Sequence, residues 1–226
     1  MREKEQICES RSPLISRQIV QAAIRLHREI GFKKTTVADI ARGASMSPAN
    51  VYRFFPSRQA LEEAVVADLL EKVSAAATLA ACGGGSALER LTAVLRTISQ
   101  LHDNRLANDS KLHELLAAAD RESWPAILSY ADRIRGVVRS IIAAGQASRE
   151  VRPGSPMTLT CCLLEAMDAY LSPSRVNAAT VRPTFDEMIG FCAGALRHVA
   201  LARSMDMGAE LCPKAAGAKI AGGVCG

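Results

Sequence analysis

The chain is poor in aromatic residues and contains no long uninterrupted apolar run. Phe, Trp and Tyr make up 4% of its 226 residues, whereas 49% are hydrophobic, so most of the apolar content is aliphatic. The most apolar stretch, residues 157–171, contains Glu165 and Asp168 and is too short and too charged to cross a bilayer. We therefore expect a globular, largely helical protein with no membrane partner.

The seven cysteines include no Cys-x-x-Cys pair, and residues 1–11 (MREKEQICESR) are too charged for the apolar region of a secretion signal. We therefore expect reduced thiols and a cytoplasmic location. His102 and His113 lie on neighbouring expected helices, but two histidines without a carboxylate or thiolate at fixed spacing are a poor metal signal. We expect no metal site and no cofactor.

Catalytic motifs are also missing. The sequence has no nucleophile elbow, no His-Glu-x-x-His, no phosphate-binding loop and no glycine-rich dinucleotide fingerprint. The neighbouring carboxylates Glu62–Glu63 and Asp186–Glu187 diverge on a helix and cannot flank one substrate atom. These absences predict that the chain is not an enzyme.

No alternating strand pattern or hairpin signal occurs, which predicts an all-α fold. We expect a disordered arm over residues 1–12, a helix-turn-helix domain over 13–58, a helical ligand-binding and dimerisation domain over 59–206, and a disordered tail over 207–226. A long helix over 57–81 links head and body and ends at Cys-Gly-Gly-Gly-Ser, a flexible joint at 82–86. Further helices are expected near 86–103, 109–119, 123–148, 156–172 and 183–206.

The positive charge is confined to the first quarter of the chain. Residues 1–58 contain 11 Lys and Arg against 5 Asp and Glu, whereas residues 59–226 contain 17 against 18. A basic head on a near-neutral body favours contact with a polyanion, although a solvated basic surface would give the same count.

The stretch SPANVYRFF, residues 47–55, predicts a short helix inside this head. Ser47 is the expected N-cap, and Pro48 occupies the first helical position, where its missing N–H costs nothing. Before it, Thr36 and Asp39 form the pattern of a capping box. Two short helices joined by a tight turn make a helix-turn-helix, whose second helix can enter the major groove.

Side-chain spacing predicts which face of this helix reads DNA. Val51 and Phe55 share a face and should pack inward. Ala49, Asn50 and Arg53 then point outward, where a small residue can touch a thymine methyl, Asn can pair with adenine, and Arg can pair with guanine or a phosphate. Tyr52 and Phe54 flank this face, and the Tyr52 hydroxyl can reach a phosphate.

Residues 31–65, GFKKTTVADIARGASMSPANVYRFFPSRQALEEAV, resemble the N-terminal domain of TetR-family transcriptional regulators. The resemblance implies phosphate contacts from Thr36 and Arg58, and a groove-facing surface made by Ala49, Asn50, Tyr52 and Arg53. We expect Lys33 or Lys34 to add a further phosphate contact. Two positions depart from the family pattern: Ser45 stands where many members carry a turn glycine, and Phe54 replaces a more usual histidine or tyrosine. The predicted DNA-binding residues are Lys33, Lys34, Thr36, Ser47, Pro48, Ala49, Asn50, Tyr52, Arg53, Phe54 and Arg58.

The last two expected helices are apolar on nearly every side, so each should be buried on two faces. The resemblance implies that they pair across a twofold axis in a homodimer, while burial inside a single chain is the alternative. The predicted interface residues are Met157, Cys161, Leu164, Met188, Cys192, Ala195, Leu196 and Val199.

A binding pocket for an unknown small-molecule effector is expected between helices of the body. Its candidate residues are His102, His113, Trp124, Tyr130, Cys162 and Met167, all of which would equally suit an ordinary core. The adjacent Cys161 and Cys162 are more typical of small core residues than of a redox sensor.

The sequence therefore predicts a homodimeric, ligand-responsive repressor that binds a palindromic double-stranded DNA operator. One alternative is an all-α small-molecule binding protein without operator binding. A second is an enzyme with a buried acid–base pair among His102, His113 and Glu165.

Overall fold

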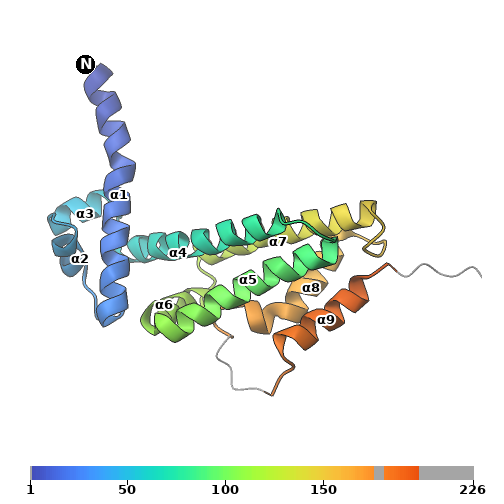
Figure 1. Ribbon diagram of the computed structural model, residues 1–226. Coiled ribbons are helices and arrows are strands. Elements are labelled where there is room, and N and C mark those ends of the chain that lie inside the picture. The colour runs from blue at the N-terminus through green and yellow to red at the C-terminus, as the bar shows by residue number, and fades with distance from the viewer. Residues whose placement is uncertain (1, 176–180, 199–226) are drawn as a thin grey trace, which may run out of the picture.

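The computed structural model describes residues 2–175 and 181–198, with side chains from Pro13 onward (Figure 1). Their helices are α1 Arg2–Ile30, α2 Val37–Gly43, α3 Pro48–Phe54, α4 Arg58–Ala81, α5 Ala87–Asn108, α6 Ser110–Arg121, α7 Pro125–Ala147, α8 Pro156–Leu171 and α9 Phe185–Leu196. These ranges contain no β-strand, which confirms the all-α prediction. They also contain no helix that is both long and apolar enough to span a membrane.

The helices form a small head and a larger body that share α4. In Figure 1, α1 stands across the beginning of α4, and α2 and α3 lie beside α1. From there α4 runs into the body, where it packs against α5 and α7, while α8 lies against α7 and α9 against α8. One hydrophobic core extends from the head into the body. Its contiguous cluster of buried residues includes Ile19, Leu61, Leu70 and Ile142.

The predicted caps define the two short helices of the head. Thr36 and Asp39 form a reciprocal capping box at the start of α2, with the Asp39 backbone N–H donating to Thr36 Oγ1 at 3.2 Å. Ser47 caps α3 by accepting from the backbone N–H of Asn50 at 3.3 Å, and Pro48 is its first residue. Between the helices, Ser45 has φ +58°, a left-handed conformation that explains why a glycine suits this position.

Close backbone approach holds the far end of the body together. Gly145, near the end of α7, packs so tightly that a Cβ there would lie 2.6 Å from the Ala87 Cβ and 2.6 Å from Val151 Cγ2. The backbone N–H of Ala87 donates to Glu150 Oε2 at 2.5 Å, which ties the start of α5 to the turn after α7. Any side chain at position 145 would force these elements apart.

Two boundaries differ from the predicted ones. The expected arm over 1–12 is not separated from the first helix, because α1 is continuous from Arg2 and contains Pro13. A proline inside a helix removes one backbone hydrogen bond and favours a kink, which is why the sequence predicted a boundary there.

The last helix, expected to run to residue 206, ends at Leu196. Arg197 is extended and pairs with Val151 in an isolated antiparallel bridge, with Arg152 N–H donating to Leu196 O at 2.8 Å and His198 N–H to Glu150 O at 2.9 Å. This long-range pairing satisfies backbone groups that a continued helix would have used. The expected tail over 207–226 lies outside the described residues.

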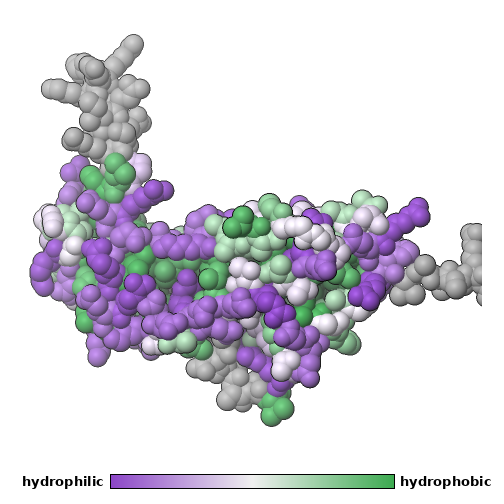
Figure 2. All heavy atoms as spheres, viewed as in Figure 1, coloured by the Kyte–Doolittle hydropathy of each residue, from purple (hydrophilic) through white to green (hydrophobic). Residues whose placement is uncertain are grey.

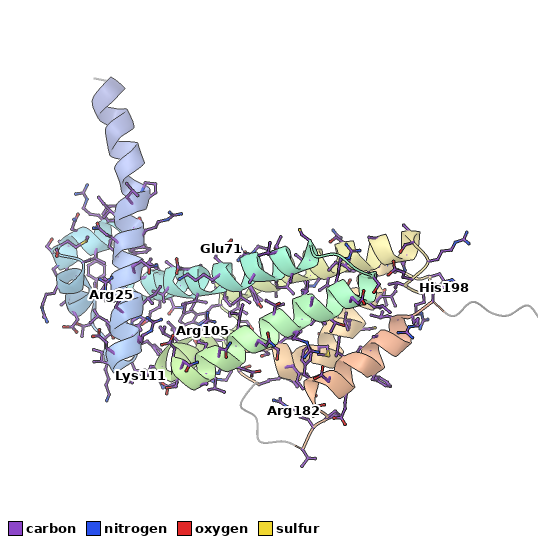
Figure 3. The ribbon with its side chains drawn as sticks, viewed as in Figure 1. Arg25, Glu71, Arg105, Lys111, Arg182 and His198 are labelled. Atoms are coloured by element: carbon purple, nitrogen blue, oxygen red, sulfur yellow. The ribbon has the colours of Figure 1, made fainter. Side chains whose placement is uncertain are left out.

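Polar contacts join the head to the body at a second point besides α4. Arg28 of α1 forms a bidentate pair with Asp109, at 2.7 and 3.0 Å, just before α6. The Lys111 ammonium of α6 donates to the backbone oxygen of Glu29 (Figure 3). The beginning of α6 is therefore fastened to the end of α1.

Two buried histidines should make the free energy of unfolding depend on pH. Burial, with a smaller contribution from Arg58, lowers the pKa of His27 from 6.5 to about 4, and burial lowers that of His102 to about 3. Below pH 6.5 the unfolded chain binds these protons while the folded chain does not, so stability falls as the pH falls from 6.5 towards 4. We expect a loss of about 1–2 kcal/mol per histidine at pH 5, measured by urea unfolding between pH 5 and 7.5.

Replacing His102 with Gln should flatten this pH dependence, because the substituted side chain takes up no proton in the unfolded state. The variant His198→Gln, at the end of the described chain, serves as the matched control and should leave the slope as it is. Equal slopes in all three proteins would contradict the assignment.

Candidate nucleic-acid interface

The outward face of α3 presents polar and small side chains beside a cation. Ala49 and Arg53, one helical turn apart, are exposed, and Asn50 is half-buried beside them. Tyr52 is 47% exposed, while Val51 is buried against the head core. Among the described residues, Arg53 makes no hydrogen bond or ion pair, so its guanidinium is available to a ligand.

The predicted inward and flanking residues occupy different positions around α3. Phe54 and Phe55 are half-buried and pack against the hydrophobic core, which fixes the end of the helix. Ser47 and Pro48 are exposed at its beginning. The face of the head seen in Figure 2 is mostly hydrophilic, as a surface that meets water or a polyanion must be.

Arg58 has a structural role that the sequence did not predict. Its Nε donates to Glu62 Oε1 at 2.7 Å, and Nη2 donates to the Phe32 backbone oxygen at 2.6 Å. The Glu62 side chain is only 10% exposed, so Arg58 supplies its counter-charge. These contacts hold the turn after α1 against the start of α4.

Thr36 and the two lysines differ in how far their polar atoms are available to a ligand. The Thr36 hydroxyl already donates to Asp39 Oδ2 at 2.6 Å, and this capping lowers the pKa of Asp39. Lys33 and Lys34 are both exposed, with the Lys33 ammonium 5.8 Å from the centre of the Phe32 ring. The lysines are therefore the better placed of the three to meet a phosphate directly.

The prediction missed several polar residues along α1. A groove of about 450 Å³ between α1 and the turn after α2 is lined by Leu14, Arg17, Gln18, Gln21, Arg25, Gly43, Ala44 and Ser45. Arg25 donates to the Gly43 backbone oxygen at 3.4 Å (Figure 3). The signal was present, because positions 14, 17, 18, 21 and 25 share one helix face opposite the buried residues. Arg17 and Arg25 give this groove positive charge.

The structure separates the residues predicted for the effector pocket. Tyr130 lines a small cavity in the body, whereas His113 lines a groove between the head and the body. His102 and Met167 are fully buried, and Trp124 is buried with Nε1 donating to Glu122 Oε2 at 2.9 Å.

Cys162 was placed in this pocket, but it lies on the exposed side of α8 and does not line the cavity. The buried face of α8 contains Thr160, Leu163, Met167 and Tyr170, and helical geometry turns position 162 away from it.

The predicted dimer residues divide into two groups. Met157, Cys161 and Ala195 are exposed and Leu164 and Met188 half-buried, so they can meet a second chain. Cys192 and Leu196 are each 6% exposed and already belong to the core of the single chain. Phe191, which was not among the predicted residues, is 74% exposed on α9, and Val199 lies outside the described residues.

No group of three or more His, Cys, Asp and Glu side chains in the described ranges is arranged to hold a metal ion. Cys82, Cys161, Cys162 and Cys192 are free thiols, and burial raises the pKa of Cys192.

Both parts of the chain match models of known families. Residues 19–65 match the model described as bacterial regulatory proteins, tetR family, and residues 87–189 match a tetracyclin repressor-like C-terminal domain. The chain is 29% identical over 130 residues to the HTH-type transcriptional regulator BetI of Rhizobium meliloti (strain 1021). That similarity spans 58% of this chain and 58% of the relative, which is less than two thirds of its length.

Solved structures share the fold. The crystal structure of RolR in complex with resorcinol has a TM-score of 0.58 at 17% identity, covering 83% of this chain and 87% of the other. AibR in complex with isovaleryl coenzyme A and operator DNA has a TM-score of 0.52 at 17% identity, covering 81% and 98%. At these identities the similarity establishes the fold alone.

The different surroundings of Arg53 and Arg58 give a stability prediction. Arg58→Ala removes the counter-charge of Glu62 and the hydrogen bond to Phe32, so it should lower the free energy of unfolding by about 1 kcal/mol. Arg53→Ala removes no hydrogen bond or ion pair among the described residues and should stay within about 0.5 kcal/mol of the parent. Urea unfolding of both variants measures the difference. Equal stabilities would show that the Arg58 guanidinium is dispensable to the fold.

Proposed function

Because the chain belongs to the TetR family of bacterial regulatory proteins, we propose that it is a homodimeric, ligand-responsive repressor that binds a palindromic operator. The family's helix-turn-helix domain makes it a DNA-binding transcriptional regulator. The outward face of α3 is the observation that carries the finer proposal, because it exposes Ala49, Tyr52 and an unpaired Arg53 on a helix held by caps.

Base and phosphate contacts divide between the exposed groups. Asn50 and Arg53 discriminate bases, as amide and guanidinium groups do in a major groove. Tyr52, Lys33 and Lys34 contact phosphates and set the register of the head on the duplex. Arg58 and Thr36 contribute mainly by positioning, because their polar atoms are held by Glu62, Phe32 and Asp39.

The proposed dimer uses the exposed faces of α8 and α9. Met157 and Cys161 are one turn apart on α8, and Phe191 and Ala195 are one turn apart on α9. A large apolar side chain that is 74% exposed, such as Phe191, favours an interface. A twofold dimer gives two heads that read the half-sites of a palindrome.

The proposed response to a ligand rests on a cavity in the body and on fold relatives whose structures hold small molecules. RolR is described with resorcinol, and AibR with isovaleryl coenzyme A and operator DNA. A regulator of this kind works where the chromosome is, which agrees with the expected cytoplasmic location.

Selection of duplexes from a random pool tests the proposed function. We expect an inverted repeat, with affinity that falls steeply with salt because bound phosphates release counterions. A folded, dimeric protein that enriches no sequence at low salt would instead support a small-molecule binding protein without operator binding. Repeating the selection with cell extract metabolites present tests whether a co-ligand is required.

Arg53→Ala tests whether this arginine contacts bases of the operator. On the selected duplex this variant should lose about 1–3 kcal/mol of binding free energy and tolerate more bases at one position of each half-site. Arg139→Ala, an exposed arginine on α7, is the matched control and should bind as the parent does. Unchanged affinity and specificity in the Arg53 variant would remove this residue from the interface.

Phe191→Asp tests the dimer. A carboxylate at the centre of an apolar interface is left unpaired, so the chain should sediment as a monomer at micromolar concentration and bind the operator far more weakly. Leu79→Asp is the matched control, because Leu79 is 75% exposed on α4, away from α8 and α9. A Phe191 variant that remains dimeric would place the interface elsewhere.

A further inference from the structure

A cavity of about 190 Å³ lies between α5, α6, α7 and α8. Isoleucine side chains from α5 and α7, at positions 98, 127 and 134, form an apolar part of its lining together with Leu164 of α8. Asp120, Glu165 and Asp168 line it as well, and Tyr130 adds a hydroxyl. The lining therefore combines apolar surface with carboxylates.

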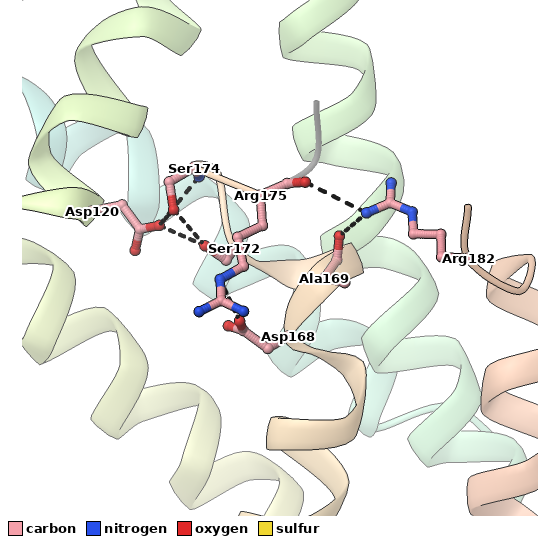
Figure 4. A network of polar contacts seen from close by, with 7 residues as sticks. All are labelled: Asp120, Asp168, Ala169, Ser172, Ser174, Arg175 and Arg182. Carbon is pink, nitrogen blue, oxygen red and sulfur yellow. Dashed lines mark hydrogen bonds and ion pairs between the residues drawn. The ribbon is translucent and has the colours of Figure 1, made fainter. Parts of the chain in front are cut away.

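The three carboxylates differ in the hydrogen bonds and ion pairs that they form within the protein. Asp120 accepts hydrogen bonds from the hydroxyls of Ser172 and Ser174, and Asp168 pairs with Arg175 at 3.0 Å (Figure 4). Glu165, by contrast, has no hydrogen bond or ion pair within the described residues. Glu165 is exposed, so its carboxylate meets water and is open to a ligand at the cavity.

The three carboxylates line the same cavity. Burial raises the pKa of Asp168, Arg175 lowers it, and the negative charges of Asp120 and Glu165 raise it further. Arg135 also lines the cavity, but it is paired with Asp132. Three carboxylates against one guanidinium leave the lining negative, and a cation would relieve the repulsion between them.

Tyr130 gives the cavity a polar atom that does not belong to the acidic cluster. The residue is only 8% exposed and lines the cavity, yet its hydroxyl has no hydrogen-bond partner among the described residues. The hydroxyl oxygen itself is not fully enclosed, so it remains accessible. A ligand that occupies the cavity can therefore form a hydrogen bond with this hydroxyl.

Nearby basic groups do not reverse this charge. The His102 ring packs edge-on to Tyr130, with the ring centres 6.4 Å apart, and burial lowers the pKa of His102 to about 3, so it is neutral at pH 7. Arg105 acts on both residues electrostatically but does not line the cavity, and it donates to the Leu69 backbone oxygen at 3.4 Å. Arg133 is paired with Glu71.

We propose that this cavity binds a small organic monocation with an apolar group, whose charged end lies against Glu165 and the Tyr130 hydroxyl. The assignment rests on the proposed function in one respect, that such a cation is the effector. Binding itself is independent of DNA.

Calorimetry on the full-length chain without DNA tests the assignment with three probes of similar size: benzylammonium, benzyl alcohol and benzoate. Benzylammonium should bind on the order of tenfold more tightly than benzyl alcohol, and benzoate should bind most weakly. Glu165→Gln should weaken benzylammonium binding by about five- to tenfold and leave benzyl alcohol unchanged. Tyr130→Phe should weaken both hydroxyl- and ammonium-bearing probes.

Glu63→Gln on α4 is the matched control, because Glu63 lines none of the described cavities and glutamine can keep its contact with Gln59. It should bind all three probes as the parent does. Tighter binding of benzoate, equal binding of all three probes, or no binding at millimolar concentrations would overturn the assignment.

The same titration distinguishes this proposal from the proposed function. If the protein binds benzylammonium selectively but enriches no operator, the cation site stands and the proposed regulatory function is wrong. If benzylammonium binds but operator affinity does not change, both the cation site and the DNA-binding function stand, and this probe is not an effector.

Discussion

The rest of the structure depends on α4 being one unbroken helix. Its 24 residues span about 36 Å at 1.5 Å per residue. Leu61 and Val65 are buried near its beginning and Leu70, Val73 and Ala77 farther along it, so the same rigid rod contributes to the packing of the head and of the body. Arg58 fixes its beginning by pairing with Glu62 and bonding to the turn at Phe32. The direction in which α3 points is therefore set by how α4 packs between α5 and α7.

Sequence reasoning succeeded where the determining contacts are local. The caps at Thr36 and Ser47 connect residues three apart, so a pattern of a few letters predicts them and the structure contains both. The buried side of α1 and the end of α4 at Cys82 follow equally from helical spacing and from a run of glycines. The resemblance to the TetR family extended this to the outward face of α3, whose contacts with DNA remain predictions.

Prediction from the sequence was incomplete where the contacting residues are far apart in the chain. The phosphate contact of Arg58 remains a prediction, but its hydrogen bond to the Phe32 oxygen, 26 residues away, was not foreseen. The end of α9 was misplaced because Arg197 pairs with Val151, and nothing near position 197 indicates that bridge. The cavity was placed by residue type, which selected buried core residues such as His102 and Met167. Its lining instead depends on which carboxylates α6 and α8 bring together.

A ligand changes operator affinity only if it binds two head arrangements with different affinities. The contacts that connect the cavity to the head lie at the two ends of α6. Asp120, near its end, lines the cavity and holds the turn at Ser172 and Ser174. At its beginning, Asp109 pairs with Arg28 and Lys111 bonds to Glu29, both on α1. A ligand that displaced α6 as a whole would therefore alter both the contacts at the cavity and the contacts made to α1. The head is thus held by α4 from one side and by α6 from the other, and the second attachment is the one that touches the cavity directly.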